Sequence, residues 1–204
     1  ESDYDYSGLN GRLIVPFGNK DMTVIVAHDR RDFEGAGDSD FQPIPLATGT
    51  GFGELRTTTG EARFDTRWSD TLSTLVGVFA STQDSFSSST TTITPLAISS
   101  TATADTDINL WAGFGTVFWN FAPEWELSVG LRFDHQTVES VAGTGFSSSY
   151  EADEWQPRVA LRRSFGDSMV YASVARGFRG GGANGPGAPN PLWDGDSVWT
   201  YEFG

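Results

Sequence analysis

Very short polar turns alternate with long polar segments along this chain of 204 residues, and the stretches between them have the pattern of β-strands. A chain that connects its strands tightly at one end and loosely at the other is typical of a transmembrane β-barrel, with short periplasmic turns and long extracellular loops. The sequence therefore predicts an all-β, antiparallel, up-and-down barrel wall. The expected short turns cover residues 18–21, 69–71, 122–124 and 165–167, and the expected long loops run near residues 34–50, 84–106, 139–153 and 179–196.

Strict alternation with a period of two is clearest over residues 125–135. The odd-numbered residues from Trp125 to Phe133 are all apolar, and the even-numbered residues from Glu126 to Asp134 are polar or glycine. A sheet with one apolar face and one polar face requires this pattern. With the segments that alternate less regularly, we expect nine strands, over residues 8–17, 22–33, 61–68, 72–82, 108–121, 125–135, 155–162, 169–178 and 198–203.

Strand length favours a barrel over a soluble β-sandwich. Strands of soluble proteins usually have about 5–6 residues, whereas tilted strands that cross a membrane need about 9–11, and most of the expected strands are long enough. Aromatic residues also cluster beside the short turns, where an interfacial girdle would place them. These residues are Phe17, Trp68, Trp119, Phe121, Trp125 and Phe165.

The composition argues against several classes of protein. The formal net charge of −14 disfavours a nucleic-acid partner, which would need a basic surface. The chain has no cysteine, so Cys-based zinc sites and Cys nucleophiles are excluded. It also lacks a G-x-S-x-G nucleophile motif. We therefore expect no enzyme activity, no catalytic residues, no cofactor and no metal site.

The expected outer loops and the expected lumen differ in chemistry. Residues 85–103 are rich in Ser and Thr, and residues 180–191 are almost entirely Gly, Pro, Ala and Asn. Such segments bury too little apolar surface to order themselves, so we expect them to be mobile. In the strands, arginines on the polar face are expected to point into the lumen and pair with acidic neighbours. The expected lumen-facing arginines are Arg63, Arg132, Arg158, Arg162 and Arg176.

Several segments resemble the barrel of TonB-dependent outer-membrane receptors. Residues 170–181 are similar to the family's strand that ends in Arg-Gly-Phe-Arg before a long outer loop, and residues 199–204 are similar to the strand that follows this loop. Residues 127–134 resemble the family's Gly-Leu-Arg-Tyr-Asp strand. Residues 54–56 and 75–79 resemble a Glu-Leu-Arg and Gly-x-Phe pair found upstream, so the pieces also occur in the family's order.

The resemblance implies a location in the bacterial outer membrane, in contact with its lipid. The family's barrel has about 22 strands, so residues 1–204 are expected to be an internal part of the barrel domain, with the plug domain and the remaining strands absent. The resemblance also implies energised uptake of a ferric siderophore or another scarce, large ligand, with the TonB complex acting through the missing plug.

A passive porin-like channel and a soluble secreted β-sandwich that binds a ligand remain alternatives to the receptor. From their position and residue type, five residues of the outer loops are the expected ligand contacts. These are Phe41, Phe146, Tyr150, Trp193 and Asp194.

Overall fold

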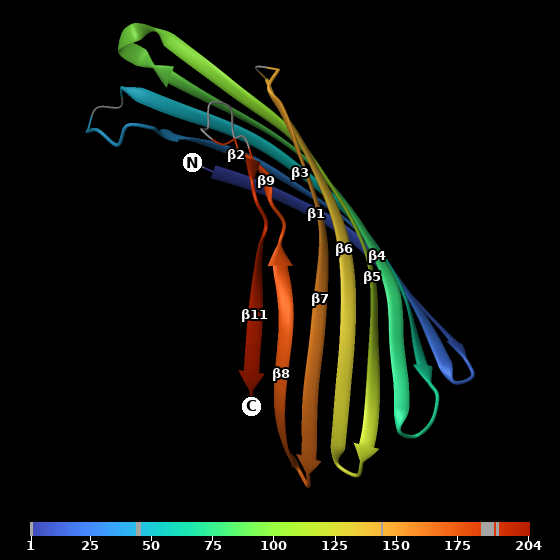
Figure 1. Cartoon of the computed structure of the whole chain (residues 1–204). Coiled ribbons are helices and arrows are strands. Elements are labelled where there is room, and N and C mark those ends of the chain that lie inside the picture. Colours follow the sequence, from blue (N-terminus) through green and yellow to red (C-terminus); the bar gives the residue numbers. More distant parts are fainter. Residues whose placement is uncertain (1, 44–45, 144, 185–189, 191) are drawn as a thin grey trace.

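The computed structural model describes residues 2–43, 46–143, 145–184, 190 and 192–204. These residues form one curved nine-stranded antiparallel sheet in the order β1-β2-β3-β4-β5-β6-β7-β8-β11, and β9 and β10 form a separate two-stranded ribbon (Figure 1). The predicted up-and-down topology is therefore confirmed. The strands are β1 (Ser2–Phe17), β2 (Lys20–Asp38), β3 (Ala47–Arg67), β4 (Leu72–Ile93), β5 (Ile98–Ala122), β6 (Trp125–Ala142), β7 (Ser147–Phe165), β8 (Ser168–Arg179), β9 (Gly182–Ala183), β10 (Leu192–Trp193) and β11 (Asp196–Phe203).

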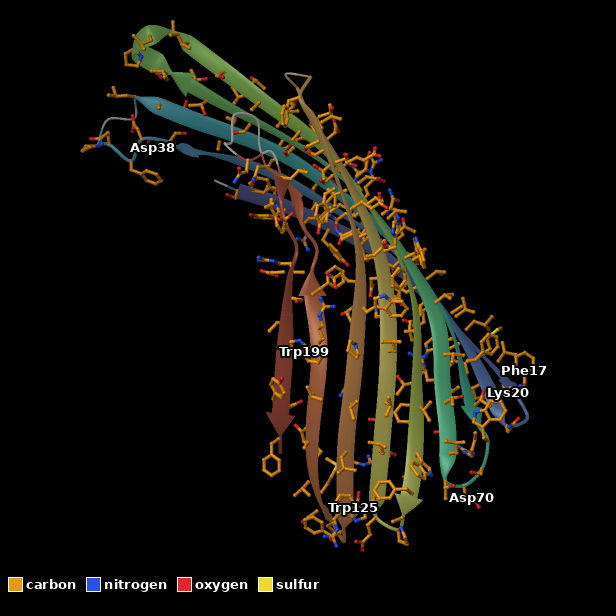
Figure 2. All side chains as sticks on the ribbon, in the orientation of Figure 1. Phe17, Lys20, Asp38, Asp70, Trp125 and Trp199 are labelled. Atoms are coloured by element: carbon orange, nitrogen blue, oxygen red, sulfur yellow. The ribbon has the colours of Figure 1, made fainter. Side chains whose placement is uncertain are left out.

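The predicted short turns are confirmed at one end of the sheet. Gly18 and Gly166 adopt left-handed backbone conformations, with φ of 64° and 58°, in the turns after β1 and β7. Glycine reaches this region at no steric cost, which explains its place in these two turns. Figure 2 shows Phe17, Lys20, Asp70 and Trp125 near the short turns and Asp38 at the opposite end of the sheet.

The predicted boundaries of the long loops are wrong, because the strands continue through most of these polar segments. The connections observed at the far end are residues 39–46, 94–97 and 143–146. Residues 85–103 form the end of the β4–β5 hairpin, which includes a short 3-10 turn at Thr94–Leu96. Threonine is β-branched and suits a strand, and hydroxyl pairs such as Thr90–Thr101, at 2.8 Å, link the two strands.

The last predicted loop agrees with the structure, in which residues 180–195 connect β8 to β11. Within residues 179–196, β8 ends at Arg179 and the ribbon of β9 and β10 follows. Residues 185–189 and 191, on which part of the predicted mobility falls, lie outside the described residues.

The alternation of side chains gives the sheet two distinct faces. Paired residues share a face, so Val129 lies beside Val117 and Val159, and Arg132 lies beside Phe114. We call the face of Val129 the outer face and the face of Arg132 the inner face. Along β5, the inner residues from Ala104 to Phe118 are all buried or half-buried, whereas most of the outer residues between them are exposed. The inner face is therefore the concave one, where curvature crowds the side chains together.

The outer face carries large apolar side chains that nothing in the described part of the chain covers. Val76, Val129 and Leu131 are about half exposed, at 50%, 46% and 48%. A soluble β-sandwich would cover these residues with a second sheet, but the described strands of the main sheet form a single layer. Among the described residues, no helix has the length and apolarity needed to cross a membrane.

The β7–β8 pairing covers only part of these strands. The backbone pairs run from Phe165–Ser168 up to Arg158–Ala175. Pro157, which has no N–H to donate, is the next residue of β7. We call the unpaired region beyond Arg158 the β7–β8 seam.

Candidate functional site

An apolar band bounded by two rows of aromatic rings crosses the outer face. Near the short turns, Phe121 lies between Trp119 and Trp125, with ring centroids 5.6 and 6.2 Å away. Farther along the strands, Phe133 lies 5.5 Å from Trp111 and 4.8 Å from Trp155. We call these rows the near girdle and the far girdle. From Trp125 to Phe133 a strand extends about 26 Å, which is of the same order as the roughly 25 Å lipid-facing band of membrane barrels.

Beyond the far girdle, the outer face becomes charged and predominantly acidic. Arg30 pairs with Asp32 at 2.9 Å, and Arg56 pairs with Glu54. Burial and the neighbouring Asp84 raise the pKa of the Asp107 carboxyl. Charges are costly against lipid, so this part of the sheet belongs in water. We call these residues the outer collar: Asp3, Asp5, Arg30, Asp32, Glu34, Asp38, Glu54, Arg56, Asp84, Asp105, Asp107, Glu139, Glu151 and Asp153.

Ion pairs line the inner face behind the apolar band. Arg132 donates to the carboxylate of Asp134, with an Nη2–Oδ1 distance of 2.7 Å, and Gln156 Nε2 donates to Asp134 Oδ2 at 2.5 Å. Asp134 is only 2% exposed, so these donors compensate a buried charge. The guanidinium of Arg132 also lies over the rings of Phe79 and Phe114, at 5.4 and 5.7 Å.

The structure places four of the five expected lumen arginines on the inner face by strand register. Arg63 lies 3.3 Å from Glu61, and Arg162 lies 3.1 Å from Glu126. Arg158 lies between Gly130 and Ala175, and Arg132 has the partners given above.

Arg176 is placed differently from the other arginines. It is paired with Trp199. It lies two residues from Val174, so the strand register places both residues on the outer face. Its guanidinium lies at the β7–β8 seam, where Nη1 is 2.7 Å from Glu154 Oε2 and donates to the carbonyl of Trp155 at 2.5 Å. The spacing of two residues from Val174, which was expected to point outward, was visible in the sequence, but Arg176 was nevertheless expected to point inward.

The expected ligand contacts fall into two groups. Phe41, which is 89% exposed, and Phe146 lie in the connections after β2 and β6, with β3 to β6 between them. The Tyr150 ring and the backbone of Trp193 both lie against Gly181, because a Cβ added there would lie 2.6 Å from the ring and would also meet the Trp193 carbonyl.

The segment around Trp193 is held against the sheet by several contacts. Gly195 donates its backbone N–H to Tyr150 Oη at 3.2 Å. Arg179 pairs with Asp196 at 2.8 Å and lies 5.6 Å from the centroid of the Trp193 ring. Asp194, between Trp193 and Gly195, is carried by the same segment but is exposed.

Comparison with known proteins identifies the family. The family model described as "TonB dependent receptor-like, beta-barrel" matches residues 2–204. The chain belongs to the TonB-dependent receptor family. The family and the barrel fold expected from the sequence are thereby confirmed, and barrels of this family are outer-membrane proteins of bacteria. A search of curated protein sequences finds no match.

Solved receptor structures share the fold at low sequence identity. The ferric yersiniabactin uptake receptor FyuA from Yersinia pestis has a TM-score of 0.82 and 16% identity, and the match covers 98% of this chain and 32% of FyuA. The copper transporter OprC has a TM-score of 0.72 and 16% identity, and the match covers 86% of this chain and 30% of OprC. The ferripyoverdine receptor of Pseudomonas aeruginosa has a TM-score of 0.71 and 17% identity, and the match covers 99% of this chain and 30% of that receptor. The chain thus spans about a third of the length of these proteins.

The structure of this TonB-dependent receptor segment also shows a ring cluster that the sequence analysis missed. Tyr4 and Phe33 lie on the inner face beyond the far girdle, with ring centroids 4.9 Å apart. Tyr6 lies on the same face and donates its hydroxyl to Asp29 Oδ1 at 2.5 Å. The first strand was expected to begin at residue 8, although the alternation of acid and tyrosine over residues 3–6 is a signal that β1 begins earlier.

Proposed function

We propose that this chain supplies part of the barrel wall and outer surface of a receptor that takes up a ferric siderophore or a similar scarce ligand. The observation that carries the proposal is the family match over residues 2–204. FyuA and the ferripyoverdine receptor, which share the fold, are named for ferric siderophores. OprC, which shares it too, is named for copper, so the fold by itself leaves the ligand open.

The two faces support a position in the wall of an outer-membrane barrel. The apolar band and its two girdles suit contact with lipid, and the ion-paired inner face suits a polar lumen. In this proposal, the TonB complex supplies energy through a plug domain that residues 1–204 do not include. The chain's own part is to hold the lumen open and to position residues that contact the ligand.

Tyr150 and Trp193 are the best supported of the expected ligand contacts. The Tyr150 ring lies at the inner face against Gly181, and the segment that carries Trp193 and Asp194 is anchored there by the bond from Gly195 to Tyr150. Phe41 and Phe146 lie at exposed hairpin ends. We propose that these two residues touch the ligand early, before it reaches Tyr150 and Trp193.

Deletion of the gene that encodes this chain tests the proposal. Iron-starved cells would be given ⁵⁵Fe loaded on an aryl-capped phenolate chelator, a tricatecholate, a trihydroxamate or citrate. We expect uptake of at least one chelate to be lost in the deletion strain, restored by the gene and abolished by deletion of tonB. Uptake that is independent of tonB would favour the porin-like alternative, and unchanged uptake of all four chelates would refute a ferric siderophore of these classes as the ligand.

A further inference from the structure

We propose that the outer face at the far end of β3, β4 and β5 binds a neutral polysaccharide of the cell surface. Two rows of residues that cross these strands consist entirely of threonine and serine. We call them the hydroxyl array: Thr48, Thr92 and Ser99 in one row, and Thr50, Thr90 and Thr101 in the other. Because this face points away from the lumen, binding here is independent of the ligand that the receptor takes up.

The strands hold the hydroxyl array in a regular arrangement. Neighbouring strands lie about 4.8 Å apart, and residues that share a face of one strand lie about 6.7 Å apart, so hydroxyls recur in two directions. The hydroxyl oxygens of Thr90 and Thr101 are 2.8 Å apart, and those of Thr92 and Ser99 are 2.9 Å apart. In each pair one hydroxyl donates to the other, which leaves one O–H donor and several lone pairs for a ligand. Threonine side chains are stiff at χ1, so less entropy is lost on binding.

A groove beside the hydroxyl array has the size and lining of a sugar subsite. Its volume is about 490 Å³, within the range of roughly 300–1,000 Å³ that is usual for small-molecule sites, and its lining includes Glu34, Thr50, Phe52 and Thr90. Phe52 lies in the row next to Thr50, and its ring centroid is 6.1 Å from that of Phe86. The ring offers an apolar surface to the C–H face of a pyranose, and the hydroxyls and the carboxylate can accept hydrogen bonds from the sugar hydroxyls.

The charges around the hydroxyl array limit the class of ligand. On the outer face of β2 to β5, the described charged residues from the row of Glu54 to the hairpin tip are Asp32, Glu34, Asp38, Glu54 and Asp105. All are acidic, so they repel a polyanion such as a phosphorylated or uronate-rich chain. Cores of protein interfaces are enriched in aromatic residues, Met and Arg, whereas the array contains only hydroxyl side chains. A neutral polyol therefore suits this face best.

The β4–β5 hairpin carries the hydroxyl array far from the membrane. Thr101 lies ten residues from Trp111 of the far girdle, a distance of about 33 Å along the strand. β6 pairs with β5 only as far as Ala104–Ala142, so the hairpin extends beyond this neighbour (Figure 1). Polysaccharide chains that are anchored in the outer leaflet pass the outer wall of a barrel at this height. They are the neutral polyols that this face meets.

Removal of two hydroxyls in the full-length receptor tests the site. The probe is the neutral fraction of the host's surface polysaccharide, released from its lipid by mild acid, and saturation-transfer NMR on the purified receptor in detergent gives Kd. We expect Thr50→Val with Thr90→Val to raise Kd at least about 5-fold, from the loss of two hydrogen bonds. Replacement of both residues by serine should leave Kd within about twofold, because the hydroxyls remain.

The matched control lies on the opposite face of the same hairpin. Thr91 and Ser100 are paired on the inner face, so Thr91→Val with Ser100→Ala should leave Kd unchanged. Heat-modifiable mobility in gels checks that each variant folds, and Phe52→Leu, which removes the ring from the groove, supplies a further variant that should weaken binding.

Several results would overturn the site. They are no binding by the wild-type receptor, equal effects of the outer and inner pairs of substitutions, tighter binding of the acidic polysaccharide fraction, and binding only of the intact lipid-anchored glycolipid. Chelate uptake by the Thr50→Val, Thr90→Val receptor should equal that of the wild type, and its loss would place the groove in the transport path and also overturn the site. Failure of the wild-type receptor to take up any chelate would refute the proposed function but leave polysaccharide binding intact.

Discussion

The apolar band and the part of the sheet beyond the far girdle are formed by the same strands, but they distribute charge between the two faces in opposite ways. On β6, Val129 points outward and the Arg132–Asp134 pair points inward within the apolar band. Farther along the same strand, Glu139 points outward, and Val138 and Ala142 are buried on the inner face. We call the part of the sheet beyond the far girdle the extension. The surroundings of each face decide its chemistry, because lipid selects apolar side chains on the outer face of the band and water permits an acidic collar on the outer face of the extension.

The position along the strands at which charged residues appear on the outer face marks the boundary between lipid and water. A charge at the centre of the lipid-facing band costs about 2–4 kcal/mol and costs little near the interface. The outer collar begins directly beyond Trp155 with Asp153, and one outer position farther from Trp111 with Asp107, where that cost ends. Inside the barrel no such constraint applies, so the inner face of each region is free to serve the lumen.

The largest expected effect tests the inner face of the band. Asp134→Ala would leave the guanidinium of Arg132 without its main partner at a site where Asp134 is 2% exposed. We expect the full-length receptor to lose about 3–5 kcal/mol of unfolding free energy, measured by urea denaturation in detergent. The double variant Arg132→Met with Asp134→Leu removes both charges and should recover much of the loss. A loss below about 1 kcal/mol for Asp134→Ala would show that water, not Arg132, solvates this carboxylate.

One pair of identical substitutions tests the boundary directly. Val129 and Val141 both lie on the outer face of β6 with similar exposure, 46% and 48%. Val129→Arg should destabilise the receptor by about 2–4 kcal/mol in lipid vesicles. Val141→Arg, placed among acidic neighbours in water, should change stability by less than about 0.5 kcal/mol. Equal costs at the two positions would contradict the assignment of the far girdle to the membrane interface.

A smaller effect is expected for the pH dependence of the outer collar. Partial desolvation in the folded state and the neighbouring Asp84 raise the pKa of Asp107, so the folded state binds its proton more tightly than the unfolded state does. The ionised carboxyl therefore destabilises the β4–β5 hairpin at neutral pH, and stability rises as the pH falls toward and through the folded pKa. Asp107→Asn should slow amide exchange in this hairpin at pH 7. The free energy of opening should rise by less than about 1 kcal/mol, because the group is exposed, and its pH dependence should disappear. Asp3→Asn, on β1, is the control.

The smallest expected effect concerns the hydroxyl pairs of the extension. Thr90→Val removes the bond to Thr101 but keeps the β-branched shape. We expect a change of a few tenths of a kcal/mol, measured as amide protection along β4. Thr90→Gly, which also removes the strand preference, should cost about 1 kcal/mol. Unprotected amides throughout residues 86–92 of the wild-type receptor would contradict the hairpin itself.

The part of the fold within the membrane could be predicted from the sequence, and the extension could not. Alternation is visible over residues 125–135 because one face meets lipid and the other a polar lumen. Beyond the far girdle neither face needs to be apolar, so the hydrophobic period disappears and residues 85–103 were expected to form a mobile loop. A weaker signal survives there, because Asp105 and Asp107 flank the neutral Thr106 and so place charge on one face.

The candidate site was predictable by residue type but not by arrangement. Tyr150 and Trp193 stood out as rings in outer segments, yet the approach of the Trp193 segment to the Tyr150 ring depends on the missing side chains of Gly181 and Gly195. Tyr4 and Phe33 are distant in the chain, and they meet because the register of β1 on β2 places them opposite each other. That register depends on the whole hairpin, so no local pattern of residues reveals it.

The β7–β8 seam has a mechanical consequence. Below Arg158, a pull on β8 is shared in parallel by a row of backbone bonds that must break together. Beyond it, the described contacts to β7 are a few side-chain bonds, chiefly Arg176 with Glu154 and Tyr150 with Gly195, which can yield one at a time. Force applied to the segment of Trp193 would thus peel that segment from the wall while the wall itself keeps its shape.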